Sequence, residues 1–132
     1  HLYADYINQR HSDGDMYPPS LEQFESFLCQ GPAASNTRFI CFRLEQKLLA
    51  VAVVDMLPKG LSAIYTFFDP AYDVRSLGRL AVLWQIRWAQ SQAMDFVYLG
   101  YWIKACQKMA YKAEYRPLQV FEDLVWQPLK LT

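Results

Sequence analysis

The chain has 132 residues, 53% of them hydrophobic, and 13 basic residues balance 13 acidic ones. This length and composition predict one folded domain and exclude a disordered or low-complexity chain. No apolar run approaches the roughly 18 residues of a membrane-spanning helix, so we expect no membrane contact. The chain opens at His1 with no signal peptide before its first helical pattern, and we expect a fragment of a longer protein.

The cysteines and histidines do not indicate a metal site. Three cysteines stand far apart without a C-x-x-C pair, and only two histidines are present. This set is poor material for a disulfide framework or a zinc site. Buried, reduced thiols in a cytoplasmic protein, with neither metal nor cofactor, are the expectation. The three are Cys29, Cys41 and Cys106.

Two short helices are expected first. Residues 3–11 fit an amphipathic helix, and the polar residues 12–19 form a turn. Ser20 is a candidate N-cap for a second helix, because its hydroxyl can accept from free backbone N–H groups. Gly31-Pro32 ends that helix. Its apolar residues, at helical spacing, are Leu21, Phe24, Phe27 and Leu28.

Three strands follow. Thr37 to Leu44 and Lys47 to Leu57 are separated by the polar pair Glu45-Gln46, which is typical of a hairpin. A turn at 58–60 leads to a third strand from Leu61 to Phe68, rich in aromatic and β-branched residues. The spacing predicts an antiparallel meander.

The second half alternates helices and strands. Ser76 to Gln92 predicts a long helix, Phe96 to Leu99 a buried strand, and Gln107 to Tyr115 a further helix. Leu118 to Phe121 and Val125 to Leu129 predict a closing pair of strands. The apolar face of the long helix is expected to comprise Leu77, Leu80, Ala81, Trp84 and Trp88.

Positive charge concentrates between residues 74 and 117. That stretch holds seven basic and two acidic residues, a balance of +5, which leaves −5 for the rest of the chain. A local positive field attracts phosphates or carboxylates. The alternative is that these side chains are solvated faces of two helices.

The start of the long helix is a candidate anion site. Free N–H groups and the helix dipole favour an anion near Ser76, and Gly78 permits close approach to the backbone. Arg75 and Arg79 flank this position and can hold phosphate oxygens bidentately. The alternative is an ordinary serine N-cap with surface arginines.

Two aromatic residues follow the buried strand. Tyr101 and Trp102 come after Gly100 and can stack on a nucleobase such as a 3′-terminal adenine. They can equally pack under the following helix.

The last helix carries cations on one predicted face. Lys108, Lys112 and Arg116 stand at i, i+4 and i+8 without acidic partners at matching positions, so an anionic partner would relieve their repulsion. A solvated basic face is the alternative.

General bases are scarce. His11 stands beside two aspartates and can titrate near neutral pH. Asp69 and Asp73 are the only acidic pair next to the basic block, and their alternative role is turn chemistry.

Together these segments resemble one family. The stretches QRHSDGDMYPPS, LSAIYTFFDPAYDVRSLGRLAVLWQIRWAQ and VYLGYWIKACQKMAYKAEYRPLQVF are similar to the C-terminal domain of aspartate/glutamate leucyltransferases, from about Tyr6 to Trp126. That domain is similar to the one in arginyl-tRNA–protein transferases. The resemblance implies an α+β, acetyltransferase-like (GNAT) fold with a central mixed, mostly antiparallel sheet flanked by helices, in one domain over residues 1–132.

The resemblance also implies a reaction. The N-terminal amine of a protein that begins with Asp or Glu attacks the ester of an aminoacyl-tRNA, which marks the protein for degradation by the N-end rule. Aminoacyl-tRNA is the co-substrate, and the enzyme is a cytoplasmic aminoacyltransferase. The chemistry of that reaction makes Arg75, Ser76 and Gly78 candidates to meet the phosphates of the tRNA 3′ end, with Trp102 to stack on its base. Lys108 and Lys112 are candidates to hold the acceptor carboxylate, with Arg116 on the same basic face. Tyr101 and Tyr111 are candidates for the oxyanion donor, and Asp69 and His11 for the base.

The sequence departs from the family in two places. The family's N-terminal, cysteine-containing domain is absent, and we expect that domain to be a partner of this chain. The final hairpin has Phe121 to Trp126 where the family tends to have a Gly before the Trp. Arginyl transfer, CoA-dependent N-acetylation and a non-catalytic domain that binds acidic N-termini or tRNA are the alternatives. The lone Gly78, without a fuller Gly-rich loop, disfavours CoA.

Overall fold

The structure is a computed structural model that describes residues 1–10, 12, 17–26, 36–102 and 105–130. It divides into two compact units, His1–Gly100 and Tyr101–Thr132. The first unit holds a four-stranded sheet and the second a two-stranded one. Within the described residues, no helix is long and apolar enough to cross a membrane.

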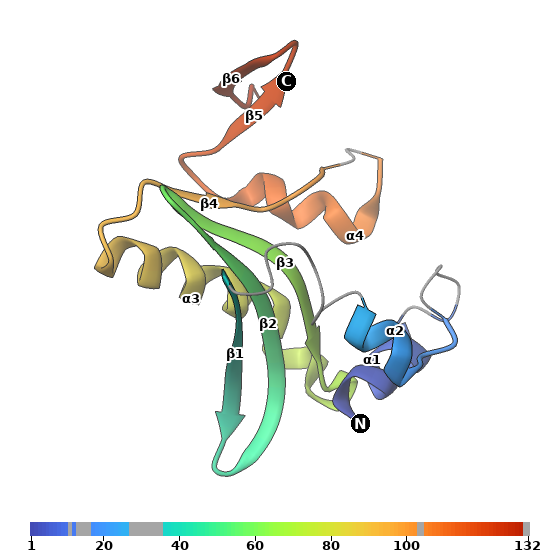
Figure 1. Cartoon of the computed structure of the whole chain (residues 1–132). Helices are drawn as coiled ribbons and strands as arrows, with labels where there is room; N and C mark the ends of the chain where they lie inside the picture. The colour runs from blue at the N-terminus through green and yellow to red at the C-terminus, as the bar shows by residue number, and fades with distance from the viewer. Residues whose placement is uncertain (11, 13–16, 27–35, 103–104, 131–132) are drawn as a thin grey trace. The chain divides into compact units, whose positions relative to one another are not determined.

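The first unit is built on a mixed sheet (Figure 1). Strands β1 (Thr37–Leu44), β2 (Lys47–Leu57) and β3 (Gly60–Phe68) are antiparallel neighbours, as the hairpin signals predicted. Strand β4 (Phe96–Tyr98) pairs in parallel with the first three residues of β3 only. The α+β class and the mostly antiparallel sheet are therefore confirmed.

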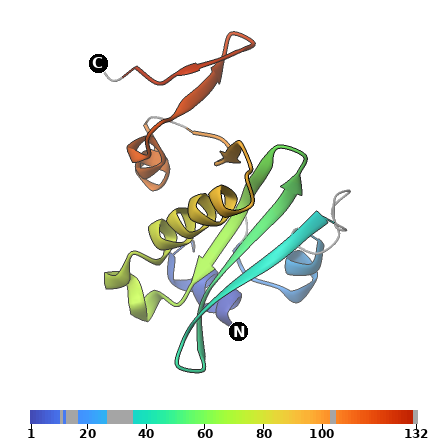
Figure 2. The same cartoon turned by 90° about the vertical axis from the view of Figure 1, so that its left-hand side faces the viewer.

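Helices cover both faces of this sheet. Helices α1 (Leu2–Arg10) and α2 (Leu21–Phe24) lie on one face and α3 (Leu77–Ser91) on the other (Figure 2). Because both faces are covered, β2 is buried without alternation from Leu49 to Val54. The core on the α1 side is largely aromatic and includes Tyr3, Tyr6, Ile7, Phe67 and Phe68.

The predicted apolar face of α3 is partly wrong. Leu80 and Trp84 are exposed, and the Trp84 ring contacts Phe42 and stacks on Trp88. The buried residues of α3 are instead Leu77, Ala81, Val82, Gln85 and Ala89, four of them spaced four apart. A polar residue, Gln85, is thus fully buried, which the pattern of apolar residues alone does not predict.

The second predicted helix is described in part, since α2 spans Leu21–Phe24, and Phe27, Leu28 and Cys29 lie outside the described residues. One further expectation needs correction. Strand β4 is not fully buried: Phe96 is 44% exposed, because β4 has a single neighbour, β3, in the sheet. The cap of α2 is confirmed, since the Gln23 N–H donates to Ser20 Oγ at 3.0 Å.

Gly60 allows β4 to lie close to β3, because it has no side chain. A Cβ at this position would lie 2.1 Å from the Phe96 carbonyl oxygen. The Phe96 N–H donates to the Lys59 carbonyl next to it, at 3.1 Å. A side chain at position 60 would therefore push the two strands apart.

The second unit is small. A short helix α4 (Gln107–Ala110) continues as a 3₁₀ helix η4 (Tyr111–Glu114), and strands β5 (Gln119–Glu122) and β6 (Val125–Pro128) form the expected hairpin. The long helix predicted over 107–115 is therefore half α and half 3₁₀. No described side chain of this unit belongs to the buried core.

Candidate functional site

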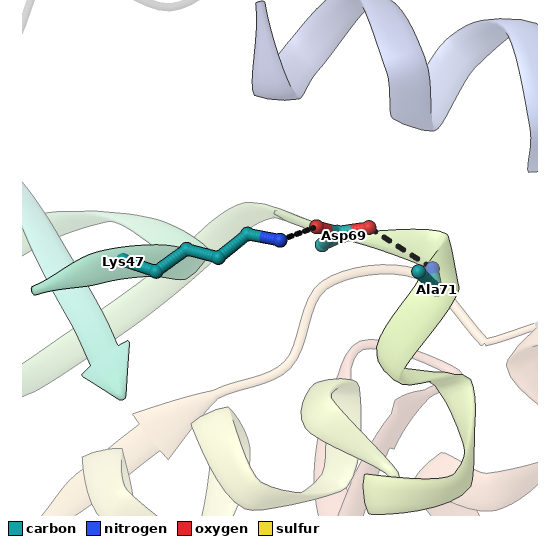
Figure 3. A network of polar contacts seen from close by, with 3 residues as sticks. All are labelled: Lys47, Asp69 and Ala71. Atoms are coloured by element: carbon teal, nitrogen blue, oxygen red, sulfur yellow. Dashed lines mark hydrogen bonds and ion pairs between the residues drawn. The ribbon is translucent and has the colours of Figure 1, made fainter. Parts of the chain in front are cut away.

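The first group of site residues lies where β3 ends. Asp69 follows Phe68, and its N–H donates to the Leu49 carbonyl at 2.8 Å, so the sheet fixes its backbone. One carboxylate oxygen accepts from the Ala71 N–H at 3.0 Å, at the start of the 3₁₀ helix η3 (Pro70–Arg75) (Figure 3). This is the turn chemistry that the sequence offered as an alternative.

The other carboxylate oxygen of Asp69 pairs with Lys47, whose Nζ lies 3.4 Å away (Figure 3). That ammonium also lies 4.9 Å from the centre of the Tyr72 ring. The hydrogen bond with Asp69 raises the pKa of Lys47 above its ordinary value. Both carboxylate oxygens of Asp69 therefore have a partner in this structure.

The second feature is the uncapped start of α3. Ser76 adopts a left-handed backbone, with φ of 49°, and its side chain makes no capping hydrogen bond. The ordinary serine N-cap is therefore wrong, and no acidic residue stands in the first turn of α3. A Cβ at Gly78 would meet nothing within 4 Å. The first N–H groups of α3 thus receive no hydrogen bond from the Ser76 side chain, and the space at Gly78 is open.

Several predicted residues lie outside what the structure describes. His11 is one of them, and the side chains of Asp73, Arg75 and Lys108 are others. Their assigned roles stay predictions.

The second unit places Tyr101 and Lys112 together. The Lys112 Nζ donates to the Tyr101 carbonyl at 2.9 Å, while the Tyr101 side chain is 89% exposed. Burial lowers the pKa of Lys112 below its ordinary value, with a smaller opposing effect of Cys106. Trp102 is half-buried, and its indole nitrogen has no hydrogen-bond partner among the described residues.

The predicted cationic face with i, i+4, i+8 spacing does not form. The α-helix stops at Ala110, and Arg116 lies beyond the end of η4. The Arg116 guanidinium donates instead to the Ala113 and Tyr115 carbonyls. The reason is local: a continuing α-helix would need an N–H at Pro117 to satisfy the Ala113 carbonyl, and proline has none.

Tyr111 is the last predicted member of this group. It begins η4, is half-buried, and its ring contacts Tyr115 edge to face at 6.4 Å between centroids. Asp69, Ser76 and Gly78 thus belong to the first unit, and Tyr101 and Tyr111 to the second.

Two residues near Asp69 were not predicted. Lys47 pairs with its carboxylate and the Tyr72 ring lies against the Lys47 ammonium, and the antiparallel register was the available signal for Lys47. Because Ala50 pairs with Phe68, the start of β2 and the end of β3 lie side by side. Within the described part of the chain, no group of three His, Cys, Asp or Glu side chains could hold a metal ion.

Comparison with known proteins assigns the class. Residues 1–122 match the family described as "Arginine-tRNA-protein transferase, C terminus". The chain belongs to this family of aminoacyl-tRNA–protein transferases.

Individual relatives point to the leucyl branch. The chain is 57% identical over 125 residues to the aspartate/glutamate leucyltransferase of Hahella chejuensis, which covers 95% of this chain and 53% of that protein. It is 58% identical to the enzyme of the same name from Stutzerimonas stutzeri, over 95% of this chain and 52% of that protein. The chain thus spans about half the length of the curated relatives it matches.

Proposed function

We propose that this chain is part of an enzyme that transfers leucine from leucyl-tRNA to the N-terminal Asp or Glu of acceptor proteins. The observation that carries the proposal is the 57% identity, over 95% of the chain, to a protein named aspartate/glutamate leucyltransferase. The product would be a substrate of N-end-rule degradation in the cytoplasm. The acceptor and the donor tRNA are the partners, and the remaining half of the relatives' length corresponds to a further partner domain.

The chemistry requires positioning more than activation. The acceptor's α-amine attacks the ester carbonyl of the aminoacyl-tRNA, a C–N bond forms, and the C–O bond to the tRNA 3′-terminal ribose breaks. The amine loses a proton and the ribose oxygen gains one, so the step is balanced without a cofactor. Because the ester is already reactive, holding both substrates in register supplies much of the rate.

The start of α3 is proposed to hold phosphates of the tRNA 3′ end. Its N–H groups have no side-chain cap, and the space at Gly78 is open. Arg75 is the expected cation beside it, and Trp102 is proposed to stack on a terminal base.

Lys112 is proposed to hold the acceptor carboxylate together with Lys108, and Arg116 to add positive charge. Lys112 keeps two donors besides the one given to the Tyr101 carbonyl. Tyr101 or Tyr111 is proposed to donate to the oxyanion of the tetrahedral intermediate.

Asp69 or His11 is proposed as the base that takes the proton of the amine. For Asp69, an incoming amine would replace the Lys47 ammonium at one carboxylate oxygen, while the other oxygen keeps its contact with the Ala71 N–H.

An acetyltransferase-like (GNAT) topology is proposed for the first unit. In support, β3 and β4 are parallel and pair over three residues only, and α3 connects them on one face of the sheet. Arginyl transfer is the second candidate, because the description of the matched family names arginine-tRNA-protein transferase.

The proposed preference for acceptors that begin with Asp or Glu can be tested with the full-length protein, labelled leucyl-tRNA and peptides that differ only in their first residue. Peptides that begin with Asp or Glu are expected to become labelled, and peptides that begin with Lys or Ala are not. Lys112→Ala should raise the KM for the Asp peptide, whereas Lys130→Ala, at an exposed position of the same unit, should not. Equal labelling of all four peptides would contradict the proposal.

A further inference from the structure

A cavity of about 490 Å³ lies in the first unit, between the start of α1, helix α2 and the sheet. This volume falls within the usual range for small-molecule sites. The side chains that matter for its chemistry come from α2 and the three long strands: Phe24, Phe39, Cys41, Leu48, Val51 and Phe67.

The wall of this cavity is apolar. None of its described lining residues is Asp, Glu, Lys or Arg, and His1, at the start of α1, is the one described lining residue that can carry a positive charge. Its two lining hydroxyl groups already make hydrogen bonds: Tyr3 donates to Gln23 Oε1 at 3.2 Å, and Ser20 accepts from the Gln23 N–H at 3.0 Å. Burial raises the pKa of Tyr3, so the phenol stays neutral. An anionic Asp or Glu acceptor finds no lysine or arginine among the described lining residues, whereas an aliphatic side chain loses nothing on entry.

The cavity is preformed on one side and open on the other. Three rings contact one another at its inner wall, with centroids 5.2 Å apart for Tyr3 and Phe24, 5.6 Å for Tyr3 and Phe67, and 6.1 Å for Phe24 and Phe67. Toward the edge strand β1, Phe39 is 47% exposed and Cys41 is an exposed, free thiol. A ligand can therefore enter along β1 without separating the aromatic wall.

The cavity also lies near the carboxylate discussed above. Leu48 directly follows Lys47 on β2, and Phe67 stands two residues before Asp69 at the end of β3. The Lys47–Asp69 pair, with its 3.4 Å separation, therefore connects the same ends of the two strands that line the cavity.

We propose that this cavity binds the leucyl side chain of the donor and so selects the amino acid that is transferred. This inference rests on the proposed function. Of the groups in that reaction, the leucyl side chain alone is aliphatic, in keeping with a largely apolar wall. The tRNA phosphates and the acceptor carboxylate would favour lysine or arginine, which are not among the described lining residues, and an arginyl side chain would find no carboxylate among them.

The first test is a substitution that fills the cavity from its exposed side. In the full-length protein, Cys41→Phe is expected to lower kcat/KM for leucyl-tRNA about tenfold or more, a typical effect of lost pocket volume. It should also shift preference toward a smaller donor, such as alanyl-tRNA prepared by mischarging. Cys41→Ser, which preserves size, should change neither value more than about twofold. Unchanged kcat/KM and preference in Cys41→Phe, with leucyl transfer intact, would overturn the cavity assignment alone.

The second test does not depend on turnover. The rate at which iodoacetamide alkylates Cys41 in the full-length protein is measured by peptide mass spectrometry, with and without 3′-deoxy-3′-leucylaminoadenosine. Slower alkylation with this analogue, but not with adenosine, is the expected result. Equal protection by adenosine would show that the cavity takes the base, and no protection by either would show that it is not part of the donor site; both results overturn the inference. Loss of leucyl transfer in the unsubstituted protein would instead refute the proposed function.

Discussion

Each of the two units of the chain is stabilised internally by a different kind of interaction. Every buried apolar side chain of the described core lies in His1–Gly100, where helices cover both faces of the sheet. In Tyr101–Thr132, the described side chains are half-buried or exposed. There, Lys112, Arg116 and Gln127 donate hydrogen bonds to backbone carbonyls.

This difference separates scaffold from candidate contact surface. Burial of apolar area supplies most of the stability of a sheet of this kind, so we expect the first unit to be rigid. The second unit exposes large apolar side chains, with Tyr101, Phe121 and Trp126 among them. Contiguous exposure of such residues is typical of surfaces that bind a partner.

The comparison is sharpest for two leucines. Leu61 is 0% exposed in β3, and Leu124 is 87% exposed in the β5–β6 turn. Leu61→Ala is expected to lower the free energy of unfolding by about 2–5 kcal/mol, because it leaves a cavity in the core. Leu124→Ala should change it by less than about 0.5 kcal/mol. Urea denaturation measures both free energies of unfolding. A similar decrease in both variants would show that the second unit shares the packing of the first.

Two glycines of the first unit should respond in opposite directions. Gly60→Ala places a Cβ against the Phe96 carbonyl and is expected to cost about 1–3 kcal/mol of stability. Gly78→Ala has open space inside α3 and should add about 0.5–1 kcal/mol through helix propensity. Thermal unfolding measures these effects. If a tRNA phosphate approaches Gly78, the more stable variant should also bind leucyl-tRNA more weakly, and unchanged tRNA affinity would remove Gly78 from the site.

The hairpin of the second unit contains local strain. Asp123 and Leu124 both have left-handed backbones, with φ of 53° and 64°. Leu124→Gly should therefore stabilise the hairpin by about 1 kcal/mol, since glycine adopts this conformation without cost. Leu124→Val should destabilise it. Amide hydrogen exchange along β5 and β6 distinguishes the variants, and faster exchange in Leu124→Gly would contradict the expected turn.

The smallest effects concern two lysines with opposite pKa shifts. Relative to the ordinary value of 10.5, the hydrogen bond with Asp69 raises the pKa of Lys47, and burial lowers the pKa of Lys112. Stability from Lys47 is therefore present below pH 10.5 and is lost as pH rises through its folded pKa. For Lys112 the folded state disfavours the proton, so stability rises with pH as the lysine titrates below 10.5.

Carbon-13 NMR of the lysine Cε atoms measures both pKa values. Asp69→Asn should return Lys47 toward its ordinary pKa and leave Lys112 unchanged, because the two lysines belong to different units. A shift of both signals in this variant would show that the two sites are coupled.

Local patterns predicted most elements of the fold. Runs rich in apolar, aromatic and β-branched residues, separated by polar turns, located β1, β2 and β3, and the Ser20 cap followed from helix-end chemistry. Features that depend on three-dimensional packing were missed. Gln85 is buried because it lies in line with Leu77, Ala81 and Ala89.

The candidate site was predicted less completely for the same reason. Ser76 and Gly78 could be found because a helix start is visible in sequence, but Lys47 became visible only through the register of β2 with β3. The contacts of Lys112 and Arg116 with backbone carbonyls could not be predicted, because the sequence did not show that the helix changes from α to 3₁₀ before Pro117. The division into two units has no marker such as a linker in the sequence.

Leucyl transfer is tested most directly by offering the full-length protein two donors at once. Leucyl-tRNA and arginyl-tRNA, each with a different isotope, are supplied in equal amounts with a peptide that begins with Asp. The predicted result is a peptide extended at its N-terminus by leucine, with arginine incorporated at the background level. Arginine in the product without leucine would contradict the assignment, and so would the absence of both labels.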